Sequence, residues 1–229
     1  MTASTTSPPP PPTPSLPTWA ERVADRSEVV QRSRARQIEQ AEAIVAAARR
    51  LVTERGDQFT TQELVKEAGV ALQTFYRIFG GKDRLLLAVF EDLIAESCVD
   101  YERAAESLPD PIARLHFYVT VTVGSLSDAS YGIGPRFVTA EHWRLHQLFP
   151  QEMAHATQHF TDMVARQLDL ANQVGILASD DPQRDAWYVT KLVMAVFHHY
   201  AYAESETDAH AIAEELWQFC LRSIGGTVA

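Results

Sequence analysis

The sequence predicts an all-α protein of about nine helices, with a small N-terminal three-helix domain followed by a larger C-terminal helical domain. From residue 32 onward, apolar residues recur at spacings of three and four with almost no strand-like alternation. Glycine and proline interrupt this pattern at intervals typical of helix lengths, most clearly at Gly80 and Gly81. The chain has 229 residues, 46% of them hydrophobic, which is enough to build a core in each domain.

Residues 1–31 are predicted to be a disordered tail. Met1–Trp19 is rich in Ser, Thr and Pro, with an unbroken proline run at Pro8–Pro12, and holds too little apolar surface to fold. A proline-rich run can also bind a peptide-recognition module, so a scaffold acting through this tail remains an alternative.

The N-terminal domain is predicted at residues 32–84. Its first helix carries an apolar stripe between Ala41 and Val52 and ends at Gly56. Its second and third helices are predicted at 60–68 and 71–78. The C-terminal domain, residues 85–229, follows from a long helix that begins at Lys82, and Asp180 or Asp181 is expected to cap the helix that begins at Pro182. The remaining helices are predicted at 82–107, 111–127, 135–148, 150–174, 182–204 and 207–224.

Charge is distributed unevenly along the chain, whose net charge is −10. Residues 1–90 hold 12 Lys and Arg against 10 Asp and Glu, whereas residues 91–229 hold 8 against 20. A surface that meets nucleic-acid phosphates must therefore lie in the first part. Cys98 and Cys220 are far apart and lack zinc-finger spacing, and no apolar run reaches membrane-spanning length, so we expect a cytoplasmic protein with no membrane contact.

A sharply defined helix start and a tight turn lie within residues 59–70. Thr60 and Glu63 have the spacing of a capping box, and Phe59 and Leu64 occupy the positions of a hydrophobic staple. Gly69 can adopt the positive φ that a turn between two helices requires. The sequence therefore predicts a helix-turn-helix.

The segments 60–70, 74–79 and 82–86 resemble the signature of the TetR family of bacterial transcription regulators in order and spacing. The resemblance covers about 50 residues, and the rest of the chain is similar to the family only in length and helical layout. It implies a helix-turn-helix DNA-binding domain at 32–84 and an effector-binding and dimerisation domain at 85–229. The implied partners are double-stranded operator DNA, a small-molecule effector and a second copy of the chain.

The resemblance also implies which side chains meet DNA. Gln73 can pair bidentately with adenine and Arg77 with guanine, while a lysine at a helix start can share a phosphate with the free N–H groups there. The other interpretation of Tyr76 is a ring packed in the core, and that of Lys82 a solvated charge. The family positions that contact phosphates correspond to Thr60, Thr74, Tyr76 and Lys82, and those on or beside the base-reading surface to Leu72, Gln73 and Arg77.

Two positions depart from the family pattern. Ala71 stands where Ser or Thr usually starts the recognition helix, and Ile78 where His or Tyr is usual, so one cap and one phosphate contact are missing. Arg32, Arg34 and Arg36 could act as a basic arm on DNA, or could simply form a solvated helix start.

The C-terminal domain is rich in aromatic residues, which would suit a cavity for an apolar or aromatic effector between the helices at 111–204. Most such residues are ordinary core in helical proteins. Leu93, Ile94 and Cys98 lie on the helix that begins at Lys82, so a ligand-dependent shift there could reach the DNA surface. The candidate pocket residues are Phe117, Phe137, Trp143, Phe160, Trp187 and Tyr188.

Two histidine pairs with i, i+4 spacing, His142/His146 and His155/His159, raise the possibility of a metal site. Each pair needs a third ligand, for which Glu141 or Glu152 is available. Neither pair belongs to a dense carboxylate–histidine set, so pocket or surface histidines are favoured, and we predict no metal and no cofactor.

The last two predicted helices carry broad apolar faces, including Leu216 and Phe219, that suit a symmetric four-helix dimer interface. No phosphate-binding loop, GxSxG or HExxH motif occurs, so we do not expect an enzyme. The sequence thus predicts a repressor that a small effector releases from a palindromic operator. The alternative is a helical enzyme or metal-binding bundle that carries a helix-turn-helix.

Overall fold

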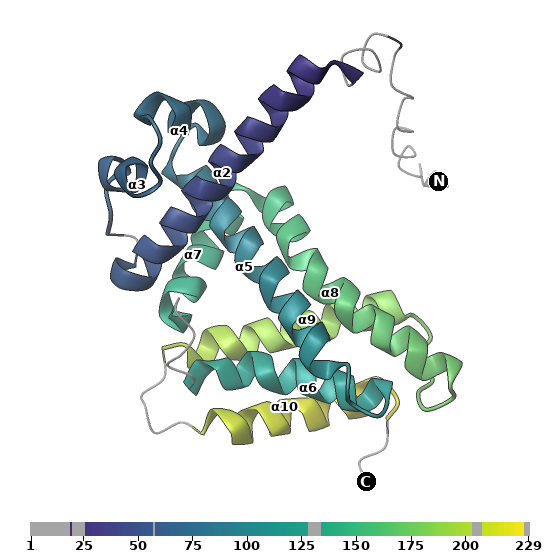
Figure 1. Cartoon of the computed structure of the whole chain (residues 1–229). Helices are drawn as coiled ribbons and strands as arrows, with labels where there is room; N and C mark the ends of the chain where they lie inside the picture. Colours follow the sequence, from purple (N-terminus) through teal and green to yellow (C-terminus); the bar gives the residue numbers. More distant parts are fainter. Residues whose placement is uncertain (1–18, 20–25, 57, 128–133, 203–207, 227–229) are drawn as a thin grey trace, which may run out of the picture. The chain divides into compact units, whose positions relative to one another are not determined.

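The computed structural model describes residues 19, 26–56, 58–127, 134–202 and 208–226. These residues form nine α-helices and one 3-10 turn and contain no strand, so the all-α prediction is confirmed (Figure 1). The predicted tail at 1–31 lies mostly outside the described residues. The elements are α2 Glu28–Arg55, α3 Thr61–Glu67, α4 Leu72–Phe79, α5 Lys82–Ala105, α6 Pro111–Gly124, η1 Ser125–Ser127, α7 Pro135–Leu148, α8 Pro150–Gln173, α9 Pro182–Tyr200 and α10 Ala209–Ser223.

The chain divides into two units at residue 41, within α2. The described part of the first unit begins its helix at Glu28, earlier than the expected start near residue 32, and Arg32 pairs with Glu28 there at 2.7 Å. Arg32, Arg34 and Arg36 are exposed, so their side chains do not contribute to a core. The second unit, residues 42–229, holds everything described below.

The capping box and the turn predicted for residues 59–70 are present. The Thr60 backbone N–H donates to Glu63 Oε2 at 2.7 Å, and the Glu63 N–H donates to Thr60 Oγ1 at 3.2 Å. The bond from the Thr60 backbone lowers the pKa of Glu63. Gly69 has φ +66, and Gly80 ends α4 with φ +71. Because these features fix where α3 and α4 begin and end, they set the direction of α4.

A small core holds the second half of α2 against α3 and α4. Its fully or almost fully buried members include Ala48, Leu64 and Phe75, and the rings of Phe75 and Phe79 lie 6.0 Å apart. Phe59, at the first position of the predicted staple, is also buried. The apolar side chains that the sequence pattern predicts to be core are therefore buried within this three-helix group.

Aspartates cap three helices of the C-terminal part. Asp181 accepts a hydrogen bond from the Arg184 N–H at 3.0 Å, which decides between the two capping candidates before Pro182. Asp110 and Asp208 cap α6 and α10 in the same way. The observed bounds lie within about four residues of the predicted ones, and residues 203–204 of the predicted helix 182–204 lie outside the described part.

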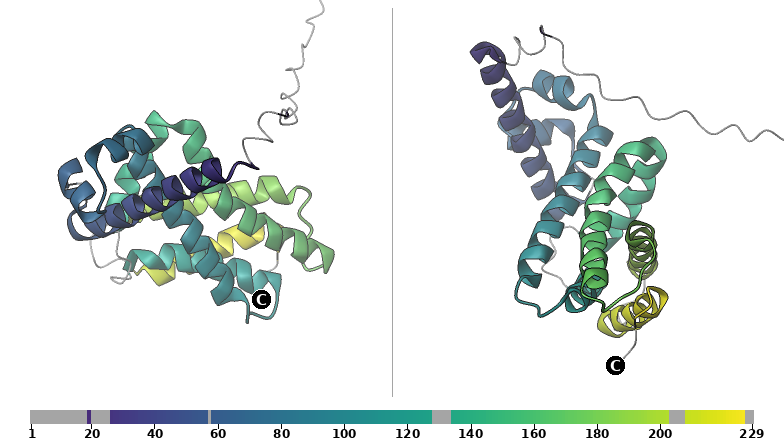
Figure 2. Two further views of the ribbon diagram at one scale, coloured as in Figure 1. Left: turned by 45° about the horizontal axis from the view of Figure 1, so that its top comes forward. Right: turned by 90° about the vertical axis from the view of Figure 1, so that its right-hand side faces the viewer.

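The core of the C-terminal part lies among α5, α6, α8, α9 and α10. α8 contacts both α5 and α9, and α10 packs on α6 (Figures 1 and 2). Tyr118, Met163 and Leu168 are among its fully buried side chains. Within the described residues, no helix has the length and hydropathy to cross a membrane.

Candidate DNA-binding surface and effector cavity

One face of α4 is exposed and carries four of the predicted DNA-contacting residues. Two of its side chains are large and apolar or aromatic: Leu72 is 41% exposed and Tyr76 51%. Gln73 and Arg77 are also exposed. Positions 72, 73, 76 and 77 share one side of a helix, and the buried Phe75 and Phe79 lie on the adjoining side. The small core therefore presents these four side chains outward together.

Two further predicted residues, Thr60 and Thr74, belong to the same helix-turn-helix. Thr60 is exposed, and its hydroxyl is engaged in the capping box. Thr74 is half-buried on α4. The α4 N-cap, Ala71, makes no side-chain capping bond, as its departure from the family pattern predicts.

Lys82 begins α5 and is half-buried. Its Nζ donates to the backbone carbonyl of Phe59 at 3.1 Å and lies 4.2 Å from the centre of the Phe59 ring. The ammonium group thus joins the start of α5 to the segment that precedes α3. A lysine held in this way can meet a phosphate with little loss of side-chain entropy, and it also contributes to packing.

A cavity of about 410 Å³ lies in the C-terminal part, within the size range of small-molecule sites. Residues from α2, α5, α6, α7, α8 and α9 and the turn η1 line it. Its aromatic lining consists of Phe90, Tyr101, Phe160 and Phe197. Its hydroxyl groups come from Thr53, Ser97, Thr122, Ser125, Thr157 and Thr190.

Of the six pocket residues predicted from the sequence, Phe160 lines this cavity and the other five do not. Trp143, Trp187 and Tyr188 are about half exposed on the outside of the helices. Phe117 packs edge-on against Tyr101, which lines the cavity, with ring centroids 6.3 Å apart, so Phe117 contacts a lining residue without lining the cavity itself. Phe137 is half-buried beside Gly56 at the end of α2.

The cavity lies farther toward α5 than the sequence suggested. Leu93, Ile94 and Cys98, the residues expected to reach toward the effector domain, line it, with Phe90 one turn earlier. Burial raises the pKa of the Cys98 thiol to about 12. The missed signal was the apolar recurrence at 90, 94, 98 and 101 on α5, which has the same helical spacing as an ordinary core stripe.

Arg49 connects α2 to α5 at the edge of this cavity. Its Nη1 donates to Asp92 Oδ2 at 2.7 Å, and its Nη2 is hydrogen-bonded to Glu96. Arg49 and Glu96 both belong to the cavity lining. Sequence reasoning missed this group, because 43 residues separate Arg49 from Asp92.

The half-buried His142 and the buried His198 form an imidazole pair beside Phe90 of the cavity lining. Their ring centroids are 4.6 Å apart, and His198 Nδ1 lies 3.0 Å from Thr139 Oγ1. Burial, with a smaller effect from His198, lowers the pKa of His142 from 6.5 to about 4. Glu141, considered in the sequence as a third metal ligand for the pair His142/His146, is instead hydrogen-bonded to Arg144 at 2.6 Å.

A segment near the N-terminus matches a known family. Residues 44–89 match the family model described as bacterial regulatory proteins, tetR family. The chain is also 37% identical over 71 residues to the HTH-type transcriptional regulator EthR of Mycolicibacterium smegmatis. That alignment covers 30% of this chain and 33% of EthR, so the chain matches about a third of that relative's length.

Solved structures resemble the fold over most of the chain. A TetR-family transcriptional regulator from Pectobacterium atrosepticum superposes with a TM-score of 0.71 at 20% identity, covering 86% of this chain and 99% of that one. RolR in complex with resorcinol superposes with a TM-score of 0.63 at 20% identity, covering 84% and 91%. At these identities the likeness concerns the fold.

Proposed function

Through its N-terminal domain this chain belongs to the TetR family of bacterial regulatory proteins, and we propose that it is a ligand-responsive repressor. In this proposal it binds a palindromic operator and is released by a small apolar or aromatic effector. Regulators of this family are transcription factors and not enzymes.

The observation that carries the proposal is the exposed α4 face. A helix that reads DNA must present polar side chains to base edges from one side while its other side packs on a core. Gln73 and Arg77 are the base-reading groups in this assignment, and Tyr76 and Lys82 bind phosphates. Because phosphate contacts position the protein and base contacts specify the sequence, the two pairs have different tasks.

The cavity supports an aromatic effector. Four aromatic rings line it, and hydroxyl groups among them can orient a small polar substituent. RolR, which shares the fold, is in complex with the small phenol resorcinol. Several hydroxyls already bond to protein oxygens, as Ser125 Oγ does to the Thr122 carbonyl at 2.7 Å, so a ligand would have to compete with those bonds.

Arg49 gives the cavity a connection to the DNA-binding helices. A ligand that displaces Glu96 or draws Arg49 inward would loosen the attachment of α2 to α5, the helix that Lys82 begins. The ligand-bound conformer would then fit two half-sites poorly, and linkage requires operator DNA to weaken the ligand by the same factor. A coupling of about 1–3 kcal/mol is ordinary for such a switch.

The proposed homodimer uses the outer sides of α9 and α10. Leu216, which the sequence assigns to this face, is buried inside the chain itself. Trp187, Tyr188 and Phe219 remain about half exposed. Two copies joined through these helices would place recognition helices for half-sites about one DNA turn, roughly 34 Å, apart.

The test is operator affinity on a panel of DNA variants. Tyr76→Phe and Lys82→Ala should weaken binding to every sequence, whereas Gln73→Ala and Arg77→Ala should change the ranking of sequences, by about 1–3 kcal/mol at the affected base pair. Arg103→Ala, an exposed arginine at the far end of α5, is the control. Because Lys82 also packs on Phe59, its variant needs an unfolding measurement without DNA.

Unchanged affinity in both the Tyr76 and Lys82 variants would remove the assignment of the phosphate-binding surface. Resorcinol and other small phenols can then be titrated with and without operator. Equal ligand affinity in both states would contradict regulation through the cavity. Catalytic turnover without sequence-selective DNA binding would favour the helical-enzyme alternative.

A further inference from the structure

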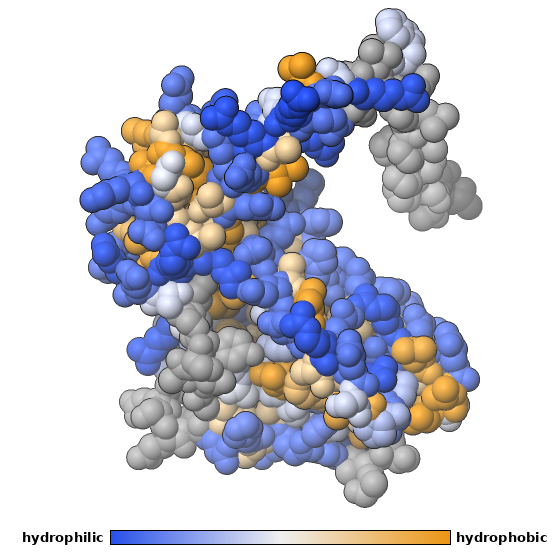
Figure 3. Space-filling model, in the orientation of Figure 1, coloured by the Kyte–Doolittle hydropathy of each residue, from blue (hydrophilic) through white to orange (hydrophobic). Residues whose placement is uncertain are grey.

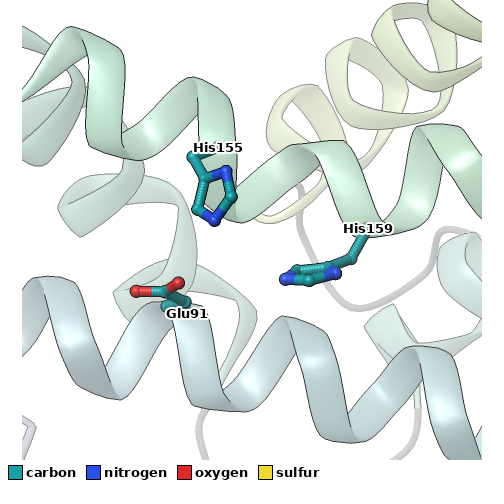
Figure 4. A group of neighbouring side chains, drawn as sticks. All are labelled: Glu91, His155 and His159. Carbon is teal, nitrogen blue, oxygen red and sulfur yellow. The ribbon is translucent and has the colours of Figure 1, made fainter. Parts of the chain in front are cut away.

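Glu91 of α5 lies opposite His155 and His159 of α8 (Figure 4). One ligand atom from each side chain lies within 4.8 Å of the other two. Figure 4 shows both imidazole rings and the carboxylate directed into the space between the two helices. All three side chains reach solvent, so an ion would have access to them.

We propose that Glu91, His155 and His159 form a binding site for a divalent transition metal ion of the zinc class. Two imidazoles and one carboxylate suit Zn²⁺, whereas Mg²⁺ and Ca²⁺ prefer oxygen ligands alone. Water would complete the coordination. This site is separate from the effector cavity and from the proposed DNA surface.

The spacing of the three groups suits such an ion. Zn–N and Zn–O bonds of about 2.1 Å place the ligand atoms of a tetrahedral site about 3.4 Å apart. Closing from 4.8 Å or less to this spacing requires only rotation of side chains at the surface. The histidines belong to the same helix at i, i+4, and their ring centroids are 5.9 Å apart, so the helix holds them on one side.

None of the three side chains is committed elsewhere in the described part of the chain. Neighbouring carboxylates are engaged: Asp92 binds Arg49, and Asp162 accepts a hydrogen bond from Gln158 at 2.8 Å. Glu91 has no such cation or amide partner among the described residues. Ligands that need not first break ion pairs bind a metal at lower cost.

The third ligand differs from the one the sequence suggested. Glu152 precedes His155 by one helical turn, but it is not part of the group that the fold brings together. Glu91 belongs to a different helix, so the bound ion would join α5 to α8. Residues on the inner sides of the same two helices, Ile94 and Phe160, line the cavity, so the metal would stiffen one of its walls.

The test is titration of the full, untagged chain with Zn²⁺ by calorimetry, followed by the same titration of single variants. We expect one tight ion per chain, and at least about tenfold weaker binding in Glu91→Gln, His155→Gln and His159→Gln. Glu152→Gln is the matched control and should bind as the wild type does. Zn²⁺ should raise the midpoint temperature of thermal unfolding in the wild type and in Glu152→Gln, but not in Glu91→Gln.

Two results would overturn the site. One is the absence of binding at Zn²⁺ concentrations up to about 100 µM, equivalent to an affinity weaker than about −5.5 kcal/mol. The other is binding that Glu152→Gln weakens and Glu91→Gln does not, which would place the ion on α8 alone. Neither result bears on operator binding, because no proposed ligand belongs to the DNA surface or the cavity lining.

Discussion

The helices at residues 42–81 and those at residues 82–226 differ in where their candidate functional side chains point: outward from the surface in the first group, and into a cavity in the second. The first group buries a few aromatic and aliphatic residues and turns Gln73, Tyr76 and Arg77 outward from α4. The second group places four aromatic side chains, those of Phe90, Tyr101, Phe160 and Phe197, around a cavity of about 410 Å³. In the proposed function, recognition of DNA depends on the direction of one short helix, whereas recognition of a small molecule depends on how α2 and five later helices meet.

The difference also concerns what the surface carries. In the C-terminal part, exposed apolar residues gather where α8 ends, including Leu170, Val174 and Ile176, and form one of the apolar patches in Figure 3. In the N-terminal group, the capping box at the start of α3 and the glycine that ends α4 determine how the exposed face of α4 is oriented. Variants that affect one group and leave the other unchanged therefore test the comparison directly.

The largest expected effect is on the small core. Phe75→Ala removes a fully buried ring and should cost about 3–5 kcal/mol of unfolding free energy in the helix-turn-helix. Operator binding should be lost, while hydrogen exchange in α8 stays slow because its core lies elsewhere. Leu72→Ala, on the exposed side of α4, is the control and should change stability by less than about 1 kcal/mol. Equal loss of protection in α4 and α8 would show that the two groups unfold together.

The next effect concerns the outside of the C-terminal part. Phe219→Glu should separate the proposed homodimer into single chains. Operator affinity should then fall about a hundredfold, because a single chain contacts only one half-site and its affinity for the operator exceeds its affinity for non-specific DNA by a smaller factor. Light scattering and a DNA titration would measure both. Leu216→Glu is a poor test because Leu216 belongs to the buried core. A monomer with full operator affinity would refute the dimer.

A smaller effect should appear on acidification. Burial lowers the folded-state pKa of His142 from 6.5 to about 4, so the unfolded chain binds more protons between these values. Stability should therefore fall as the pH decreases from about 6.5 to about 4. His142→Gln should flatten this part of the profile, and the exposed His199→Gln should not. Urea midpoints at several pH values would measure it, and an unchanged slope in His142→Gln would contradict the assignment.

The smallest effect belongs to the capping box. Thr60→Ala removes the acceptor of the Glu63 N–H and should destabilise the helix-turn-helix by about 1 kcal/mol, while Thr60→Ser should retain most of the cap. Thermal unfolding without DNA separates this effect from any phosphate contact. Loss of the same size in both variants would mean that the methyl group, and not the hydroxyl, stabilises the position.

The features predicted correctly are those that short segments determine. The capping box, the positive φ of Gly69 and the Asp181 cap each depend on residues at most four apart, so the sequence shows them directly. The cavity lining depends on which aromatic side chains turn inward when distant helices pack. Trp187 and Phe160 look alike in an apolar pattern, but one is about half exposed and the other lines the cavity.

The same reason explains the missed long-range groups. Glu152 seemed a natural neighbour of His155 because they are close in the sequence, whereas Glu91 becomes a neighbour only when α5 packs along α8. Arg49 likewise meets Asp92 and Glu96 only through tertiary packing. No local pattern contains that information.

The Arg49 contact has a consequence for chimeric biosensors. A designer who wants to change the operator specificity of the proposed repressor would exchange the helix-turn-helix and keep the C-terminal part, with a junction near Gly81. Such an exchange replaces Arg49 but retains Asp92 and Glu96, which would then lose their shared cation and repel each other across one helical turn. A chimera that preserves arginine at this position should keep its response, whereas one that introduces an alanine could bind its new promoter and yet fail to report the inducer.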